Sequence, residues 1–150
     1  MRGRARALGL LSGIFAADRA SKLWALRRLA GGGLKPLPWL WLTYVQNTGA
    51  AFGLGPKRNG FFIGLSSALI VLLLYLERAW KDKDAWTRWG LLLVLGGALG
   101  NLYDRLAYGF VVDFIDLRVW PVFNVADSCI SVGAACLMLG LWLSGDGKSR

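Results

Sequence analysis

The sequence has 150 residues, of which 55% are hydrophobic and 18% are charged, and its formal net charge is +9. A soluble domain of this length rarely carries several apolar runs of about 20 residues, so the composition predicts a single-domain integral membrane protein. The Lys and Arg residues flank the apolar runs and do not form one basic tract with interleaved aromatics. This pattern argues against nucleic acid as a partner.

The first predicted span covers residues 7–26 and contains Asp18, Arg19 and Lys22. A basic start followed by an apolar run is also found in secretory signal peptides. However, no small-x-small cleavage pattern follows the run, and apolar residues resume after it. We therefore expect a retained transmembrane helix.

Residues 31–59 form the larger segment between two apolar spans and begin with a run of glycines. The stretch "WLWLTYV" is rich in aromatic and β-branched residues, which is typical of a strand. Trp39, Trp41 and Tyr44 also suit the membrane–water interface. We expect a small β-element that rests on the membrane surface.

The predicted fold is a membrane all-α bundle of four transmembrane helices, formed by residues 1–150 as a single integral-membrane domain with the β-element between spans one and two. The spans are expected at residues 7–26, 60–76, 89–106 and 122–143. The pattern G-x-x-x-G occurs at Gly9 and Gly13 and again at Gly96 and Gly100. It predicts that the first and third helices approach their neighbours closely at these glycines.

The distribution of Lys and Arg predicts the orientation of the spans. Basic residues are more numerous on the side that holds both termini and the connection between spans two and three: Arg2, Arg4, Arg6, Arg78, Lys81, Lys83, Arg88, Lys148 and Arg150. We therefore expect a multi-pass protein with both termini in the cytoplasm. In this orientation one group of acids gathers near the outer membrane boundary: Asp18, Asp104, Asp113, Asp116 and Asp127.

Polar side chains follow helical spacing on three of the spans, so each set shares one helix face. The sets are Asn101–Asp104–Arg105, Asn124–Asp127–Ser128 and Asp18–Lys22. A charged group at the bilayer centre costs about 3 kcal/mol, so these sets indicate either pairs that hold the bundle together or a functional site. The first interpretation is as good as the second for Asp18, Lys22 and Arg105. Asp127 favours a functional site, because no partner lies near it in the sequence.

Two neighbouring carboxylates cannot both ionise easily, so one can act as a base toward water while the other acts as an acid. This aspartic-protease chemistry requires no other residue type and no metal. The sequence has no histidine, and Cys129 and Cys136 are expected to pack, so we expect no metal and no cofactor. The residue pattern leaves the identity of the pair open among Asp104, Asp113, Asp116 and Asp127.

Five motifs in order resemble lipoprotein signal peptidase, the signal peptidase II family: "DRASK" (18–22), "NTGAAFG" (47–53), "GNLYDR" (100–105), "VVDFID" (111–116) and "FNVADSCISVG" (123–133). The resemblance implies an aspartic endopeptidase that removes the signal peptide from prolipoproteins, cutting before a diacylglyceryl-modified cysteine. It also implies the bacterial cytoplasmic (inner) membrane, a site near the outer face, and lipid-modified prolipoprotein and membrane lipids as partners. We expect a monomer.

In that family the catalytic aspartates occupy the positions of Asp113 and Asp127. Other motif positions hold or shape the site: Asp18, Lys22, Asn47, Gly49, Asn101, Arg105 and Asn124, with Asp104 as a supporting acid. Tyr103 departs from the family pattern, in which an aliphatic residue is common. We expect residues 31–59 to cover the pair partly and to admit the lipid-bearing cysteine.

Three other functions use the same residues differently. A proton-coupled transporter or channel would use the acids as a relay, but the sequence shows no inverted repeat. A structural membrane subunit would use the polar stripes only to hold helices together. Another kind of intramembrane aspartyl protease would share the "YD" at 103–104, but the companion G-x-G-D pattern is missing.

Overall fold

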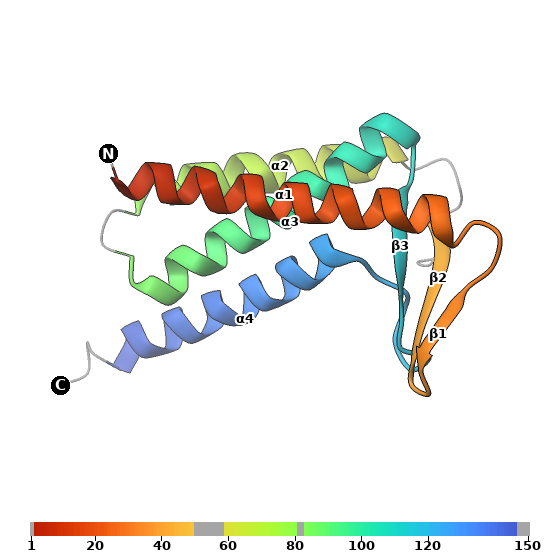
Figure 1. Ribbon diagram of the computed structural model, residues 1–150. Coiled ribbons are helices and arrows are strands. Elements are labelled where there is room, and N and C mark those ends of the chain that lie inside the picture. The colour runs from red at the N-terminus through yellow and green to blue at the C-terminus, as the bar shows by residue number, and fades with distance from the viewer. Residues whose placement is uncertain (1, 50–58, 81–82, 147–150) are drawn as a thin grey trace.

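The computed structural model describes residues 2–49, 59–80 and 83–146. The elements in order are α1 (Arg2–Arg28), β1 (Leu34–Leu37), β2 (Leu40–Asn47), α2 (Asn59–Ala79), α3 (Ala85–Tyr108), β3 (Val111–Asp116) and α4 (Val125–Asp146). The helices run alongside one another, and the sheet crosses their ends where α1 finishes and α4 begins (Figure 1). The start of α1 and the end of α4 lie at the opposite end of the bundle.

The predicted helical fold with a small β-element between the first two helices is confirmed, and a helix covers most of each predicted span. By length and hydropathy, two of the described helices are apolar enough to cross a membrane: α2 and residues 125–144 of α4. That all four helices cross the membrane stays a prediction. Part of the outer segment, residues 50–58, lies outside the described residues, as do Lys81, Asp82, Lys148 and Arg150.

Helix α3 is the central helix, because α1, α2 and α4 all pack against it. Its start is capped by Asp84, which accepts a hydrogen bond from the Thr87 N–H at 3.0 Å. Its end is set by Gly109, which adopts the left-handed conformation with φ 81° and donates its N–H to the Arg105 carbonyl at 3.2 Å. This abrupt stop allows β3 to begin two residues later, beside the end of α1.

Only one of the two predicted glycine pairs lies in a helix contact. A Cβ atom added at Gly96 would lie 2.9 Å from the Ile14 side chain, and one at Gly100 would lie 2.6 Å from Asp18 Oδ2, so α1 does pack closely here. The prediction for Gly9 and Gly13 is wrong, because neither would bring a Cβ within 4 Å of a described neighbour. The G-x-x-x-G spacing identifies a helix face that lacks side chains, but it does not show whether that face packs against another helix.

The closest backbone approach joins α3 to α4 and was not predicted. A Cβ atom added at Gly90 would lie 2.8 Å from the Gly133 carbonyl oxygen, and one at Gly133 would lie 2.9 Å from the Gly90 carbonyl oxygen. Gly97 has the same kind of contact with the Ala126 carbonyl. These contacts fix the position of α4 along the axis of α3. They therefore also fix the position of the residues at the start of α4.

The sheet is antiparallel, in the order β1-β2-β3, and its third strand was not predicted. Strand β3 pairs with β2 so that Val45 faces Asp113 and Asn47 faces Val111. Residues 111–116 form a nearly fully buried strand that packs on α1. The predicted fourth span also starts too early, because Phe123 forms a bridge with Ile115 and the helix begins at Val125.

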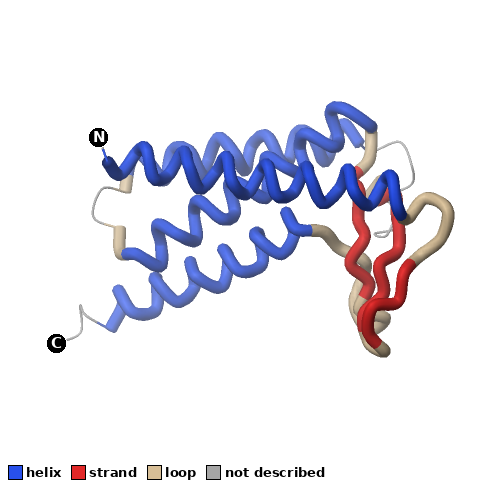
Figure 2. Tube along the Cα trace, viewed as in Figure 1, coloured by secondary structure: helices blue, strands red, loops and turns tan. Residues whose placement is uncertain are grey.

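Two buried apolar clusters hold these parts together. One lies between α2 and α3 and contains Ile70, Leu73, Leu91, Val94, Leu95 and Ala98. The other joins the end of α1 to β3 and contains Ala25, Leu29, Val112 and Phe114. Figure 2 shows the sheet standing across the helix ends, so this second cluster anchors the sheet to the bundle.

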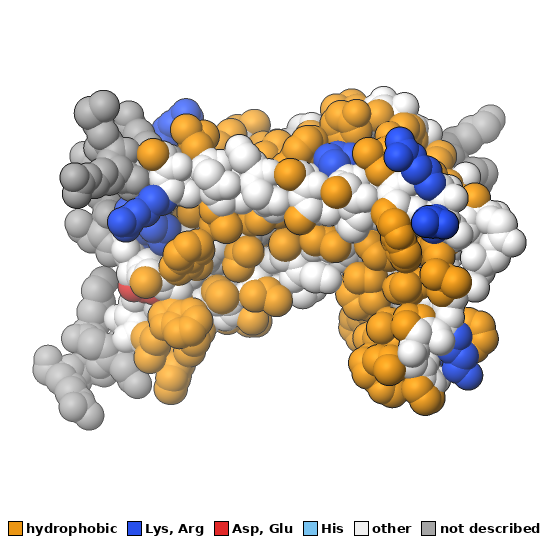
Figure 3. All heavy atoms as spheres, in the orientation of Figure 1, with side chains coloured by type: hydrophobic (Ala, Val, Ile, Leu, Met, Phe, Trp, Pro, Cys, Tyr) orange, Lys and Arg blue, Asp and Glu red, His pale blue; other side chains and the backbone are white. Residues whose placement is uncertain are grey.

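Large apolar side chains are exposed over much of the helical surface, including Phe61, Leu65, Val71, Tyr75, Met138, Leu141 and Trp142 (Figure 3). Such a continuous apolar surface is suited to lipid and not to water. The turns at one end of the sheet are also apolar and exposed: Trp39 is 60% exposed, Val119 90% and Trp120 67%.

Candidate active site

Asp113 and Asp127 reach the same place from different elements, and Asn124 contacts both. The Asn124 side-chain amide donates to Asp113 Oδ1 at 2.7 Å. The Asn124 backbone N–H donates to Asp127 Oδ2 at 3.2 Å. Asp113 is 1% exposed on β3, whereas Asp127 lies partly buried in the first turn of α4. The two carboxyl groups are therefore held on either side of one asparagine.

The local sequence explains why Asn124 and Asp127 meet. Asn124 occupies the capping position before α4, and its Oδ1 accepts the Asp127 N–H at 2.9 Å. Asp127 bonds back to the Asn124 N–H, which completes a reciprocal capping arrangement over three residues. A carboxylate in the first turn also gains from the positive end of the helix dipole.

Asn101 holds the other oxygen of Asp127. Its side-chain amide donates to Asp127 Oδ1 at 2.7 Å, while its Oδ1 accepts from Lys22 Nζ at 2.9 Å. The bond from the ammonium group requires an acceptor, so it fixes which end of the Asn101 amide faces Asp127. The predicted stripes on the first, third and fourth spans therefore meet at one site.

A buried ion network lies directly behind this site. Lys22 Nζ is 2.9 Å from Asp18 Oδ2 and 2.9 Å from Asp104 Oδ2, and all three side chains are 0% exposed. Asp18 Oδ1 accepts the Ala126 N–H at 3.1 Å, next to Asp127. Asp104 Oδ2 accepts the Val112 N–H at 3.1 Å, next to Asp113. Each buried acid thus fixes the backbone beside one of the two candidate catalytic aspartates.

The end of β2 supplies the last contact to Asp113. The Asn47 side-chain amide donates to Asp113 Oδ2 at 2.9 Å, and Asn47 Oδ1 accepts the Gly49 N–H at 2.9 Å. Gly49 has φ 82°, and a Cβ atom there would overlap the Phe62 ring, so this position requires glycine. The remaining residues of the "NTGAAFG" motif, 50–53, lie outside the described residues.

Two of the predicted residues do not bond directly to the two aspartates. Arg105 lies with its guanidinium over the Phe62 ring, with Cζ 5.1 Å from the centroid, but its charge still interacts with Asp127, Asp113 and Asp104. Within the described ranges Arg105 forms no ion pair. Asp116 pairs with Arg118 at 3.2 Å. Of the four acids that the sequence left open, only Asp113 and Asp127 share a contact, because Asp104 is bound within the ion network.

Burial raises the pKa of the Asp113 carboxyl from 3.8 to about 6. The hydrogen bond from Asn47 opposes this shift, the negative charge of Asp127 adds to it, and the bond from Asn124 opposes it again. Asp113 therefore keeps its proton at a pH at which an ordinary aspartate has lost it. A protonated carboxyl beside a second carboxyl is the arrangement that paired acid–base chemistry requires.

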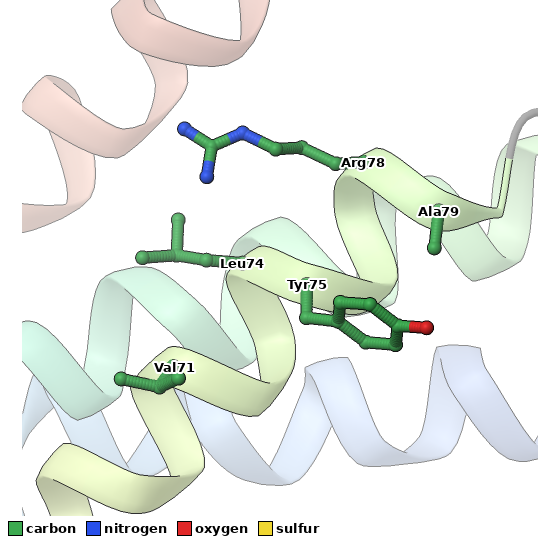
Figure 4. Close-up of a pocket in the computed structure, with 5 residues that line it drawn as sticks. All are labelled: Val71, Leu74, Tyr75, Arg78 and Ala79. Carbon is green, nitrogen blue, oxygen red and sulfur yellow. The ribbon is translucent and has the colours of Figure 1, made fainter.

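Two further observations on the described residues concern metal binding and a hollow away from the two aspartates. No group of three or more His, Cys, Asp or Glu side chains within these residues could hold a metal ion. A hollow of about 410 Å³ lies near the end of α2 far from the sheet, lined by Val71, Leu74, Tyr75, Arg78 and Ala79 (Figure 4). Its lining comes from one face of one helix, and Arg78 is its only charged residue.

Sequence reasoning missed one charged residue of the network. Arg19 forms an ion pair with Asp104 Oδ1, and its side chain is 12% exposed. Arg19 lies three residues before Lys22, so helical spacing also places it on this side of α1, and both cations bind Asp104. A charged side chain within an apolar span is unfavourable unless it has a partner. This was the signal in the sequence that could have identified Arg19.

Comparison with known proteins matches residues 10–143 to the family described as signal peptidase (SPase) II. The lipoprotein signal peptidase of Syntrophomonas wolfei is 45% identical over 142 residues, covering 89% of this chain and 90% of that protein. The lipoprotein signal peptidase of Pelotomaculum thermopropionicum is 39% identical over 143 residues, covering 94% of each chain.

The fold is also similar to a solved structure. A bacterial membrane enzyme determined by the in meso method at 1.9 Å resolution superposes with a TM-score of 0.83 and is 28% identical. The similarity covers 91% of this chain and 92% of that one. With its sequence matched almost from end to end and its fold shared with a bacterial membrane enzyme, the chain belongs to the signal peptidase II family.

Proposed function

We propose that this peptidase removes the signal peptide from diacylglyceryl-modified prolipoproteins, with Asp113 and Asp127 as its catalytic pair. The observation that carries the proposal is the shared contact through Asn124, which bonds to both carboxyl groups. Family membership supports prolipoprotein cleavage, since the relatives are lipoprotein signal peptidases. The choice of the pair rests on the geometry of the described residues.

In the proposed reaction Asp127 takes a proton from water, and the water oxygen attacks the carbonyl carbon of the scissile peptide bond. Asp113 gives its proton to the carbonyl oxygen, which yields a tetrahedral intermediate with two hydroxyl groups. As the C–N bond breaks, Asp127 gives the proton that it took from water to the leaving nitrogen, and one hydroxyl of the intermediate returns a proton to Asp113. The elevated pKa of Asp113 supports its role as the acid. Asn101 donates to Oδ1 of Asp127 and is itself held by Lys22, so the Asp127 carboxylate keeps a fixed orientation.

The proposed setting is the bacterial inner membrane, with both termini in the cytoplasm and the site near the outer face. The pair lies at the end of the bundle that carries the sheet, opposite the start of α1 and the end of α4 (Figure 1). Figure 3 shows the molecule hollowed between the sheet and the far end of α4. This shape supports access for an apolar signal helix from the lipid side. The expected cover of the pair by residues 31–59 falls partly on residues 50–58, which lie outside the described residues.

The test is cleavage of a prolipoprotein by the purified full-length protein in detergent. A diacylglyceryl-modified substrate should lose the mass of its signal peptide, and the new amino terminus should be the lipid-bearing cysteine. The matched control is the same substrate without the lipid, which should remain intact. Equal cleavage of both substrates would contradict the proposed specificity, and no cleavage of either would contradict the activity.

A further inference from the structure

Arg19 lies on α1 next to Asp18, but it binds a different part of the network. Its guanidinium pairs with Oδ1 of Asp104, whereas Lys22 and the Val112 N–H both bond to Oδ2. Lys22 also binds Asp18 and Asn101, so it serves several partners at once. Among the described residues, Arg19 makes its ion pair with Asp104 alone.

Aromatic rings enclose the Arg19 guanidinium. Its Cζ lies 4.6 Å from the centroid of Tyr103 and 5.8 Å from that of Tyr108, distances at which a cation is attracted to the face of a ring. Tyr103 is in turn held edge-on by Phe15, with centroids 5.7 Å apart. Nη2 of Arg19 is buried and finds no hydrogen-bond partner among the described residues, so the rings and Asp104 together define where this group lies.

Tyr103 supplies the ring face that lies nearest to the guanidinium. An aliphatic side chain at this position would fill space but would offer no π-face to a cation. Tyr103 and Asp104 are neighbours on α3, and both contact the same guanidinium. Arg19 and Tyr103 therefore form one unit in this chain.

The contact continues from Asp104 to the strand that carries Asp113. Asp104 Oδ2 accepts the Val112 N–H at 3.1 Å, although Val112 also lies within the β2–β3 pairing, opposite Gln46. A carboxylate held at Oδ1 cannot rotate away from this N–H. If Oδ1 were released, Asp104 could turn toward Lys22 alone, and the start of β3 would lose its anchor to the bundle.

We propose that Arg19, enclosed by Tyr103, is a positioning residue that locks Asp104 and thereby holds β3 and Asp113 in register with α4. Its role in catalysis rests on the proposed function, but the mechanical link to β3 does not. Neither residue touches the Asp113 or Asp127 carboxyl group in the described structure. The effect therefore acts through the backbone of residues 111–113.

The test combines kinetics with hydrogen exchange on the full-length protein in detergent. Arg19→Gln removes the charge, Tyr103→Leu removes the ring, and Arg27→Gln is the matched control on the exposed end of the same helix. Arg19→Gln should lower kcat about 10-fold or more with KM nearly unchanged, because misplaced catalytic groups slow the chemical step. Amides of residues 111–116 should exchange faster, while those in the middle of α3 stay protected.

The double variant distinguishes one unit from two independent contacts. Tyr103→Leu should lower kcat less than Arg19→Gln, and adding it to Arg19→Gln should cause little further loss. Arg19→Lys, which keeps the charge, should recover part of the exchange protection and serves if the glutamine variant does not fold. Additive losses, or unchanged exchange in residues 111–116, would overturn the proposal. If the wild-type protein does not cleave prolipoprotein, the proposed function fails, and the exchange result still decides the mechanical link.

Discussion

Asn124 and Asp127 bond each other reciprocally at the start of α4, through the Asn124 Oδ1 at 2.9 Å and the Asp127 Oδ2 at 3.2 Å. The same Asn124 side chain turns its amide toward Asp113. One residue therefore starts a helix and links two carboxyl groups. The two roles use different atoms, so they can be separated by substitution.

Asn124→Ser should retain the cap but lose the donor to Asp113, because serine offers only a short hydroxyl group. Asn124→Ala should lose both the helix cap and the donor to Asp113, and loss of the cap should lower the free energy of unfolding by about 1 kcal/mol. We expect both variants to cleave prolipoprotein about 10-fold to 100-fold more slowly, with only the alanine variant melting earlier. Cleavage rates and detergent melting curves of the two variants check this, and a serine variant with wild-type turnover would contradict the linking role.

Asp113→Asn and Asp127→Asn should each nearly abolish cleavage while the protein remains folded, because an amide cannot exchange a proton as a carboxyl group does. Asp116→Asn is the matched control, since Asp116 lies on the same strand but pairs with Arg118. It should keep most of the activity. Single-turnover cleavage measures all three, and the assignment of the pair is wrong if the Asp116 variant is the inactive one.

The pH dependence follows from the raised pKa of Asp113, which is about 6. The protonated form is favoured by folding, so its contribution to stability is complete below 3.8 and is lost as the pH rises through about 6. The acid required for cleavage is lost over the same range, so kcat/KM should fall above about pH 6. Asn47→Ala removes a bond that lowers this pKa and should move the fall to higher pH. A profile that does not move would exclude Asp113 as its source.

Asp104→Asn should act mainly on stability. It leaves Arg19 and Lys22 buried without the charge that they share, and breaking a buried pair costs about 3–5 kcal/mol. Turnover by the fraction that remains folded should fall less than in the Asp113 variant. Glu77→Gln is the control, because its partner Lys83 lies 3.7 Å away and Glu77 is 32% exposed. Thermal melting and active-site titration separate the two effects, and a stable but inactive Asp104 variant would make Asp104 part of the chemistry.

The exposed turns of the sheet should lie in the membrane interface. Trp39, Val119 and Trp120 form an apolar edge that water would not favour. A spin label at Val119, in a protein whose two cysteines are replaced by alanine, should be more accessible to oxygen than to a polar nickel reagent. A label at Leu72, on the exposed apolar face of α2, provides the hydrocarbon standard. Full access of the nickel reagent at Val119 would place this edge in water.

The sequence predicts the helices well because long apolar runs have few alternative structures. It predicts a strand at 39–45 from aromatic and β-branched residues, which agrees with β2, but it does not identify β1 or β3. The run at 111–116 is buried on both faces and shows no alternation. The start of α4 is also missed. Val122 and Phe123 are apolar and extend the run backward, yet Phe123 pairs with Ile115 and delays the helix.

Helical spacing correctly groups Asp18 with Lys22 and Asn101 with Asp104, because residues four or three apart share a face whatever the tertiary fold. It cannot show which way Arg105 turns, and the Phe62 ring that receives it lies 43 positions earlier in the chain. The same limit hides the glycines between α3 and α4. In each case the deciding partner belongs to another helix.

The contact between Gly90 and Gly133 has a mechanical consequence. Two helices whose backbones touch cannot slide or rock against each other without a steric clash, so the half of the molecule that presents Asp127 is stiff. Strand β3 is instead held by individual hydrogen bonds and by a small apolar cluster. The part of the molecule that carries β3 should therefore deform more easily than the α3–α4 pair. Signal peptides of different length and bulk must therefore be accommodated by movement on the strand side, and adaptation to new substrates should change residues there before it changes α4.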